Sequence, residues 1–138
     1  MQNKAKGKQG EKIAEEYLKN KGYEILDRNF HYSKFAELDL VARLGSEIIF
    51  VEVKTRTTNT FGAPEEAVDY RKMQNIFIAS KHYLKEKNIQ NLKPRIDVIA
   101  IILNEKEFKI RHIENLAMWI LISNNIYICD KQLWLNLM

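Results

Sequence analysis

The amino-terminal part of the chain alternates apolar and polar residues with the period of a helix. Within residues 9–21 (QGEKIAEEYLKNK) the apolar side chains lie three and four residues apart, at Ile13, Ala14, Tyr17 and Leu18. This spacing predicts an amphipathic helix, and Gly22, which follows lysines, is a typical stop signal. Residues 23–30 (YEILDRNF) then show partial two-residue alternation, which predicts a strand.

The most apolar segment of the first half, residues 36–56 (AELDLVARLGSEIIFVEVKTR), predicts a β-hairpin. Gly45 and Ser46 fit a two-residue turn, because glycine is favoured at its first central position. Residue 44 then pairs with residue 47, and each further pair sums to 91. One face of the hairpin carries Leu38, Leu40, Ala42, Ile49, Val51 and Val53, and the other carries Val41, Ile48 and Phe50. Apolar residues on both faces are typical of a sheet that lies between helices.

The second half of the chain continues with a helix and two strands. Pro64, followed by two glutamates, is a favourable helix start, and apolar positions recur at helical spacing up to residues 85–88 (KEKN). Residues 95–103 (RIDVIAIIL) predict a buried strand, and residues 108–113 (FKIRHI) predict a strand that pairs with it. The predicted order is αβββαββ in one α/β domain.

Composition and charge narrow the class of protein. The chain has 138 residues, 46% hydrophobic and 29% charged, which is typical of a folded globular domain. The amino terminus has no apolar stretch of signal-peptide length, so we expect a cytoplasmic protein. One cysteine and three scattered histidines make neither a disulfide nor a zinc site. The net charge of +4 makes polyanions plausible partners without identifying a ligand.

Charged residues interrupt the predicted hairpin at one end. In the register above, Asp39 lies opposite Glu52 and Glu37 lies opposite Lys54, with all four side chains on one face. Opposed like charges are destabilising, and partial burial costs each carboxylate its hydration. Three carboxylates against one ammonium group would favour a divalent cation such as Mg²⁺. The alternative is that Glu52 and Lys54 simply point outward on an edge strand.

The arrangement D-x(12)-E-x-K, after a helix that carries an acidic residue, resembles the PD-(D/E)xK nuclease superfamily. That superfamily has the restriction-endonuclease-like fold shared with archaeal Holliday-junction resolvases. The proline of the motif is missing, since Glu37 and Leu38 precede Asp39. The blocks GEKIAEEYLKNKGYEILDRNF, ELDLVA, IIFVEVKTR, FGAPEEAV, RIDVIAI and HIEN resemble, in this order, the YraN family of small bacterial proteins over about residues 7–117. The resemblance implies a nuclease-like domain in residues 1–118, with a mixed sheet of about five strands flanked by helices.

The resemblance also implies roles for individual residues. Asp39 and Glu52 would be the metal ligands for Mg²⁺ or Mn²⁺, and Lys54 would be the catalytic lysine. Glu11 would be the catalytic acid of the first helix, with Glu15 as the competing choice. Glu11 has a second reading as a first-turn glutamate that the helix dipole favours.

The expected activity is metal-dependent cleavage of DNA phosphodiester bonds, by an endonuclease or exonuclease that selects structure rather than sequence. Arg28, Arg56, Arg71 and the basic amino-terminal segment are candidates for phosphate contacts, which would make binding salt-dependent. A non-catalytic nucleic-acid-binding module is the alternative. The sequence leaves DNA versus RNA open.

Residues 119–138 (WILISNNIYICDKQLWLNLM) form an apolar extension rather than a further domain. The longest uninterrupted apolar run is far shorter than the ~20 residues of a membrane-spanning helix, so we expect no membrane anchor. Asn124 and Asn125 could turn a short hairpin. The extension is either an interface, for instance of a homodimer, or an accident of the 3′ end of the gene.

Overall fold

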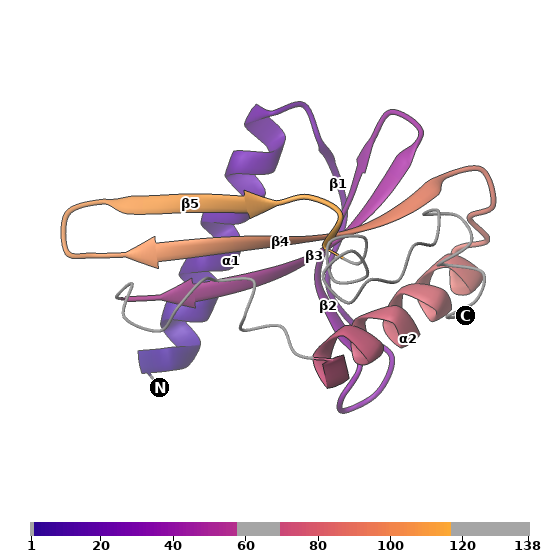
Figure 1. Cartoon of the computed structure of the whole chain (residues 1–138), viewed down its shortest axis with the longest axis horizontal. Helices are drawn as coiled ribbons and strands as arrows, with labels where there is room; N and C mark the ends of the chain where they lie inside the picture. Colours follow the sequence, from indigo (N-terminus) through magenta and orange to yellow (C-terminus); the bar gives the residue numbers. More distant parts are fainter. Residues whose placement is uncertain (1, 58–69, 117–138) are drawn as a thin grey trace, which may run out of the picture.

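The computed structural model describes residues 2–57 and 70–116 of the chain (Figure 1). In these two segments, two helices and five strands follow one another as α1 (Gln2–Asn20), β1 (Glu24–His31), β2 (Glu37–Leu44), β3 (Glu47–Arg56), α2 (Tyr70–Glu86), β4 (Lys93–Leu103) and β5 (Phe108–Ile113). This is the predicted order αβββαββ.

The strands form one mixed sheet whose spatial order, β1-β2-β3-β4-β5, is also their order in the chain. β3 and β4 pair in parallel, and the other neighbours pair antiparallel. Parallel neighbours need a long crossover connection, and α2 lies in the segment that joins β3 to β4. The predicted α/β class and five-stranded mixed sheet are therefore confirmed, and they are consistent with a restriction-endonuclease-like fold.

The two helices cover opposite faces of the sheet and create two core clusters. On the α1 side, Ala14 and Leu18 pack against apolar side chains of β2, β3 and β4. On the α2 side, Met73 and Ile76 pack against a cluster that includes Phe50. Burying a side chain as large as phenylalanine stabilises a fold by about 1.5–3 kcal/mol. Apolar residues on both sheet faces are thus explained by the two helical layers.

Helix α1 begins earlier than its apolar pattern suggests. The predicted start at residue 9 is wrong, because the helix begins at Gln2. The added turns carry Lys4, Lys6 and Lys8, which are good helix formers without apolar periodicity. The predicted end is confirmed: Gly22 adopts a φ of 91°, and its N–H donates to the carbonyl oxygen of Lys19 at 3.0 Å.

The β2–β3 turn has the predicted register over the paired part of the hairpin. Leu44 pairs with Glu47 and Leu40 pairs with Val51, while Gly45 adopts the φ of 60° that its place in the turn requires. The predicted face of Leu38 is wrong, because Leu38 packs in the α2-side cluster and Leu40 in the α1-side cluster. Regular alternation between faces does not continue past the end of the β2–β3 ladder.

A buried ion cluster joins β4 to β5 and to the end of α1. Asp97, with 0% of its surface exposed, accepts hydrogen bonds from Arg95 at 2.8 Å and from His112 Nε2 at 2.7 Å. Arg95 also donates to the Tyr23 hydroxyl at 2.8 Å, and His112 Nδ1 lies 3.2 Å from the Tyr17 hydroxyl. His112 is therefore a packed residue of the core.

Two expectations lie outside the described residues: the helix start at Pro64, and the hairpin or interface in residues 119–138. Within residues 2–57 and 70–116, neither helix combines the length and the apolar character needed to cross a bilayer.

Candidate functional site

Strands β2 and β3 separate at the end of their common ladder. The ladder stops at the pair Leu40–Val51, one position before Asp39 and Glu52. From there β2 continues along β1, and β3 continues along β4. The predicted cross-strand pair of Asp39 and Glu52 is therefore not part of the ladder. Instead, Asp39 Oδ2 accepts the backbone N–H of Val53 at 2.8 Å and bridges the two strands where they part.

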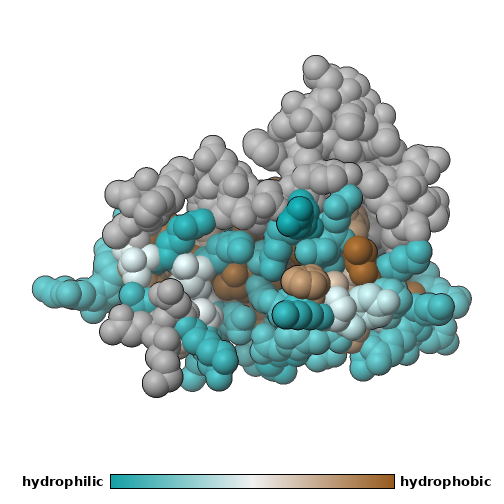
Figure 2. All heavy atoms as spheres, turned by 90° about the horizontal axis from the view of Figure 1, so that it is seen from below, coloured by the Kyte–Doolittle hydropathy of each residue, from teal (hydrophilic) through white to brown (hydrophobic). Residues whose placement is uncertain are grey.

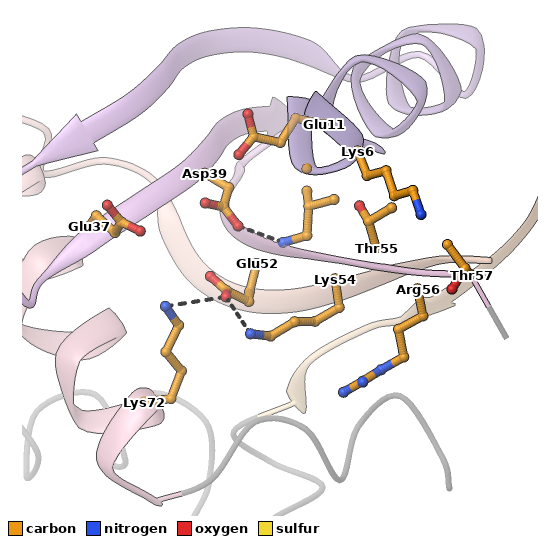
Figure 3. Close-up of a pocket in the computed structure, with 12 residues that line it drawn as sticks. Lys6, Glu11, Glu37, Asp39, Glu52, Lys54, Thr55, Arg56, Thr57 and Lys72 are labelled. Atoms are coloured by element: carbon orange, nitrogen blue, oxygen red, sulfur yellow. Dashed lines mark hydrogen bonds and ion pairs between the residues drawn. The ribbon is translucent and has the colours of Figure 1, made fainter. Parts of the chain in front are cut away.

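A pocket of about 430 Å³ lies at this separation (Figure 3). Helix α1, both separating strands and the start of α2 contribute to its wall. The lining residues are Lys6, Gly7, Glu11, Glu37, Asp39, Glu52, Val53, Lys54, Thr55, Arg56, Thr57 and Lys72. Four side chains that the sequence singled out on one hairpin face thus line one pocket together with Glu11.

The charge balance of the pocket differs from the expected excess of acid. Among the described lining residues there are four carboxylates and four basic side chains; the basic ones are Lys6, Lys54, Arg56 and Lys72. The prediction of three carboxylates against one ammonium group is wrong, because it counted only four side chains on one face of the hairpin and left out Arg56 and the helices. Helices α1 and α2 bring two of the additional cations.

Glu52 is the most deeply buried acid of the pocket, with 4% of its surface exposed. Its Oε1 lies 3.4 Å from Lys54 Nζ and 3.3 Å from Lys72 Nζ, so two ammonium groups approach one carboxylate oxygen from different elements (Figure 3). Its Oε2 is buried and has no hydrogen-bond partner among the described residues. A buried carboxylate oxygen without a partner costs free energy unless a ligand satisfies it.

The pocket disfavours the ionised form of the Asp39 carboxyl group. Burial, followed by the negative charge of Glu52, raises the pKa of Asp39 to about 8, although the hydrogen bond from the Val53 N–H acts in the opposite direction. Burial and the charges of Glu37 and Glu52 likewise raise the pKa of Glu11. Each of these carboxyl groups retains its proton more strongly than a free side chain does, as expected of acids that share one site.

The structure separates the two acidic candidates of α1. Glu11 lines the pocket, and Figure 3 shows its side chain directed toward Asp39. Glu15 lies one turn farther along and forms ion pairs with Lys19 and Arg28. Of the two, Glu11 is therefore the one placed beside the other acids.

The three candidate arginines have different positions. Arg56 lines the pocket. Arg28, on β1, does not line the pocket; its guanidinium pairs with Glu15 of α1. Arg71 is exposed at the beginning of α2 and is not among the lining residues. The structure thus brings one of the three to the acids.

Lys72 is the main pocket residue that the sequence did not single out. Its ammonium group pairs with Glu52, and this pairing raises its pKa even though burial alone would lower it. A signal was present in the helical pattern, because Lys72 precedes the core residue Ile76 by four positions and so borders the sheet-facing side. Arg71, five positions before Ile76, lies farther from that side.

Gly10 allows α1 to cross β3 at very short range. A Cβ atom at this position would lie 1.8 Å from Thr55 Oγ1 and 2.9 Å from Thr55 Cβ. Thr55 lines the pocket. Any larger residue would therefore push the amino-terminal half of α1, with Glu11 and Lys6, away from the strand that carries Glu52.

The donor set suits a hard divalent cation held by few protein ligands. Within the described part of the chain, no group of three or more His, Cys, Asp or Glu side chains is arranged to hold a metal ion. Mg²⁺ commonly retains several waters and binds one or two carboxylates together with substrate phosphate oxygens. Asp39 and the free oxygen of Glu52 fit that pattern, and they do not fit a closed structural zinc site.

Comparison with known proteins identifies the family. Residues 10–101 match the model of the uncharacterised protein family UPF0102. The protein of this family named TTE1452 in Caldanaerobacter subterraneus subsp. tengcongensis is 45% identical over 115 residues, covering 81% of this chain and 93% of that protein. A UPF0102 protein of Alkaliphilus oremlandii is 47% identical over 115 residues, covering 82% and 97%, respectively. The match spans the second half of α1, the β2–β3 hairpin and the pocket residues from Glu11 to Lys72, and the chain belongs to the UPF0102 family.

Proposed function

We propose that this protein is a metal-dependent nuclease that cleaves DNA phosphodiester bonds in the cytoplasm and selects DNA structure rather than base sequence. In this proposal the chain is a member of the PD-(D/E)xK superfamily and resembles its Holliday-junction resolvases. The observation that carries it is the pocket where β2 and β3 part, in which Asp39 and Glu52 lie beside lysines and Glu52 retains an unpartnered buried oxygen.

Asp39 and Glu52 are the residues that would hold Mg²⁺ or Mn²⁺. The Val53 N–H fixes the orientation of Asp39, and two ammonium groups fix Oε1 of Glu52 while leaving Oε2 open. Glu11 is the further acid that α1 supplies to the same pocket. When bound, the ion would supply Lewis-acid polarisation of a phosphate oxygen and a lowered pKa for water.

Lys54 and Lys72 have different roles in this proposal. Lys54, whose side chain is partly exposed, is placed to stabilise negative charge that develops on the phosphate. Lys72 pairs with the same Glu52 oxygen from α2, so that this buried carboxylate keeps one counter-charge while Lys54 contacts the substrate. Lys72 is therefore a positioning residue in this scheme rather than a catalytic one.

Basic residues around the acids support contact with the DNA backbone. Lys6 and Arg56 line the same pocket, and Arg71 is exposed at the adjoining helix start. Contacts to phosphates orient DNA without reading its bases. This composition therefore favours selection by the shape or strandedness of the DNA.

A non-catalytic nucleic-acid-binding module is the second candidate. The four basic side chains that line the pocket favour it, because they could bind phosphate without an ion. The two candidates differ in whether divalent ions change the covalent state of the DNA.

The test compares cleavage of single-stranded, flapped, four-way and blunt duplex DNA with Mg²⁺ or Mn²⁺. We expect products from the wild type and at least a 100-fold loss of rate in Asp39→Asn and Glu52→Gln. Glu105→Gln, which removes an exposed carboxylate from the β4–β5 turn, is the matched control and should cleave normally. DNA binding without products under all these conditions would reject the nuclease in favour of the binding module. Full cleavage by Asp39→Asn would reject the site.

A further inference from the structure

The turn between β1 and β2, just before the pocket residues Glu37 and Asp39, presents two exposed aromatic side chains. Phe35 is 71% exposed and Tyr32 is 49% exposed, and they are two of the four large hydrophobic side chains exposed among the described residues. Figure 1 shows this turn at the lower end of the β1–β2 hairpin, beside α2. The described surface seen from that side is mainly hydrophilic with separate hydrophobic side chains (Figure 2). The aromatic pair is thus an unusual feature of the surface.

Hydrogen bonds hold this turn in one conformation. Ser33 Oγ accepts the N–H groups of Phe35 at 3.3 Å and of Ala36 at 3.2 Å. The Tyr32 N–H donates to the Ala36 carbonyl oxygen at 2.9 Å, and Ala36 itself is buried. The Tyr32 ring also stacks on His82 of α2, with ring centroids 3.5 Å apart and planes at 10°. The backbone that carries Phe35 is therefore held in a fixed conformation.

The chain fixes the distance between this turn and the acids. Glu37 lines the pocket and follows Phe35 by two residues, and Asp39 follows it by four. Four residues span at most about 14 Å. Successive nucleotides of a stacked strand rise about 3.4 Å, so Phe35 lies within roughly four nucleotides of a phosphate held near Asp39.

The charge around Phe35 matches a nucleic acid strand. Lys34 Nζ lies 5.7 Å from the centre of the Phe35 ring, and Lys6 and Arg56 are among the basic side chains that line the pocket. Basic residues that follow the backbone, combined with aromatic rings on which bases stack, are typical of single-strand binding. A base inside a duplex is already stacked on its neighbours and offers no free face.

We infer that residues 32–36 form a base-stacking element in which Phe35 stacks on an unpaired nucleotide of DNA whose backbone lies in the pocket. The inference rests on the proposed function and gives it a substrate class: DNA with a single-stranded segment next to the cleaved bond, as in a flap or fork. The stack of Tyr32 on His82 anchors the same turn to α2.

Binding measured in EDTA tests the element separately from cleavage. The probes are fluorescein-labelled single-stranded DNA, a flapped duplex and a blunt duplex of the same sequence, followed by fluorescence anisotropy. We expect Phe35→Ala to weaken binding of the first two about ten-fold or more and to change blunt-duplex binding less than two-fold. Phe35→Trp should restore binding, whereas Phe35→Leu, which keeps an apolar side chain, should not.

Phe108→Ala is the matched control, because Phe108 is 51% exposed on β5, the strand at the opposite edge of the sheet. It should bind all probes like the wild type. Unchanged binding of flapped DNA by Phe35→Ala and Phe35→Leu would overturn the inference, and so would an equal loss on the blunt duplex.

The outcomes separate the inference from the proposed function. Cleavage that requires Asp39 and is unaffected by Phe35→Ala retains the nuclease and rejects the stacking element. Flap binding that requires Phe35, without cleavage by any variant, supports the element and rejects catalysis. Thermal melting of each variant, followed by circular dichroism, distinguishes a loss of binding from a loss of folding.

Discussion

Replacing Asp97 by asparagine removes the charge of a carboxylate that the fold encloses completely. Arg95 donates to both carboxylate oxygens at 2.8 Å, through Nε and Nη2. His112 Nε2 lies 2.7 Å from Oδ2, and the Asn115 N–H donates to Oδ1 at 3.0 Å. In the variant, the buried Arg95 guanidinium keeps Glu47 and Tyr23 as partners but loses its closest counter-charge.

The expected loss is a large part of the stability of the domain. Removing one partner of a buried ion pair costs about 3–5 kcal/mol, because the other charge stays buried. A single domain has a free energy of unfolding of about 5–15 kcal/mol. With a urea dependence near ~2 kcal/mol per M, Asp97→Asn should lower the unfolding midpoint by roughly 2 M at pH 7.

The effect has a defined pH dependence. Burial alone would raise the pKa of Asp97, but the hydrogen bonds from His112 and Arg95 outweigh it and lower the pKa below the ordinary value of 3.8. A carboxylate with a depressed pKa contributes its full stability above the unfolded value and loses it as the pH falls through the folded one. The difference between wild type and Asp97→Asn should therefore be complete from pH 5 to 7 and shrink below about pH 4.

Urea unfolding followed by circular dichroism at pH 7, 5 and 3 measures the shift of the unfolding midpoint and its dependence on pH. Glu105→Gln, a change in an exposed turn, should stay within about 0.5 kcal/mol of the wild type. The double variant Arg95→Met/Asp97→Leu should lose less than the sum of the two single losses, because it leaves neither charge unpaired. An unchanged midpoint for Asp97→Asn at pH 7, or the same difference at pH 3, would refute this account of the ion cluster.

Three further predictions concern the pocket. Gly10→Ala should destabilise the fold by about 1–3 kcal/mol, because the added Cβ clashes with Thr55. Gly7→Ala, with nothing within 4 Å of the added Cβ, should stabilise the fold by up to about 1 kcal/mol. Thermal unfolding measures both variants, and equal effects would contradict the close contact between α1 and β3 at Gly10. Lys72→Met should lower the free energy of unfolding by about 1–3 kcal/mol, because Glu52 loses one of two charged partners; an unchanged melting temperature would argue against that pairing. Mn²⁺ at 100 times its dissociation constant should stabilise the wild type by about 2.7 kcal/mol, and a Glu52→Gln variant that gains as much would show that Glu52 is not a ligand.

Local patterns were sufficient for the elements and for part of the hairpin. The spacing of apolar residues predicted both helices and all five strands in their order, because amphipathic periodicity reflects burial directly. Gly45 fixed the register from Leu40 to Leu44, since a two-residue turn leaves no freedom in which residues pair. The amino-terminal turns of α1 were not predicted, because a lysine-rich helix that packs little has no apolar period.

Of the candidate site, the sequence predicted only the residues that lie on the β2–β3 hairpin. Asp39, Glu52 and Lys54 follow from the two-residue period, and their roles stay predictions. The choice between Glu11 and Glu15 was left open, because it depends on how α1 crosses the sheet, and the close contact at Gly10 sets that crossing. Lys72 enters from α2, which no local pattern relates to β3.

The sequence by itself determined the α/β class, the order of elements and the group of charges at one end of the hairpin. Only the tertiary structure decided that β2 leaves β3 after Leu40, that Asp39 then bonds to the Val53 backbone instead of facing Glu52 in a ladder, and that helical cations balance the acids. The physical reason is range. Periodicity and turn chemistry act over a few residues, whereas strand separation and charge balance depend on contacts between elements far apart in the chain.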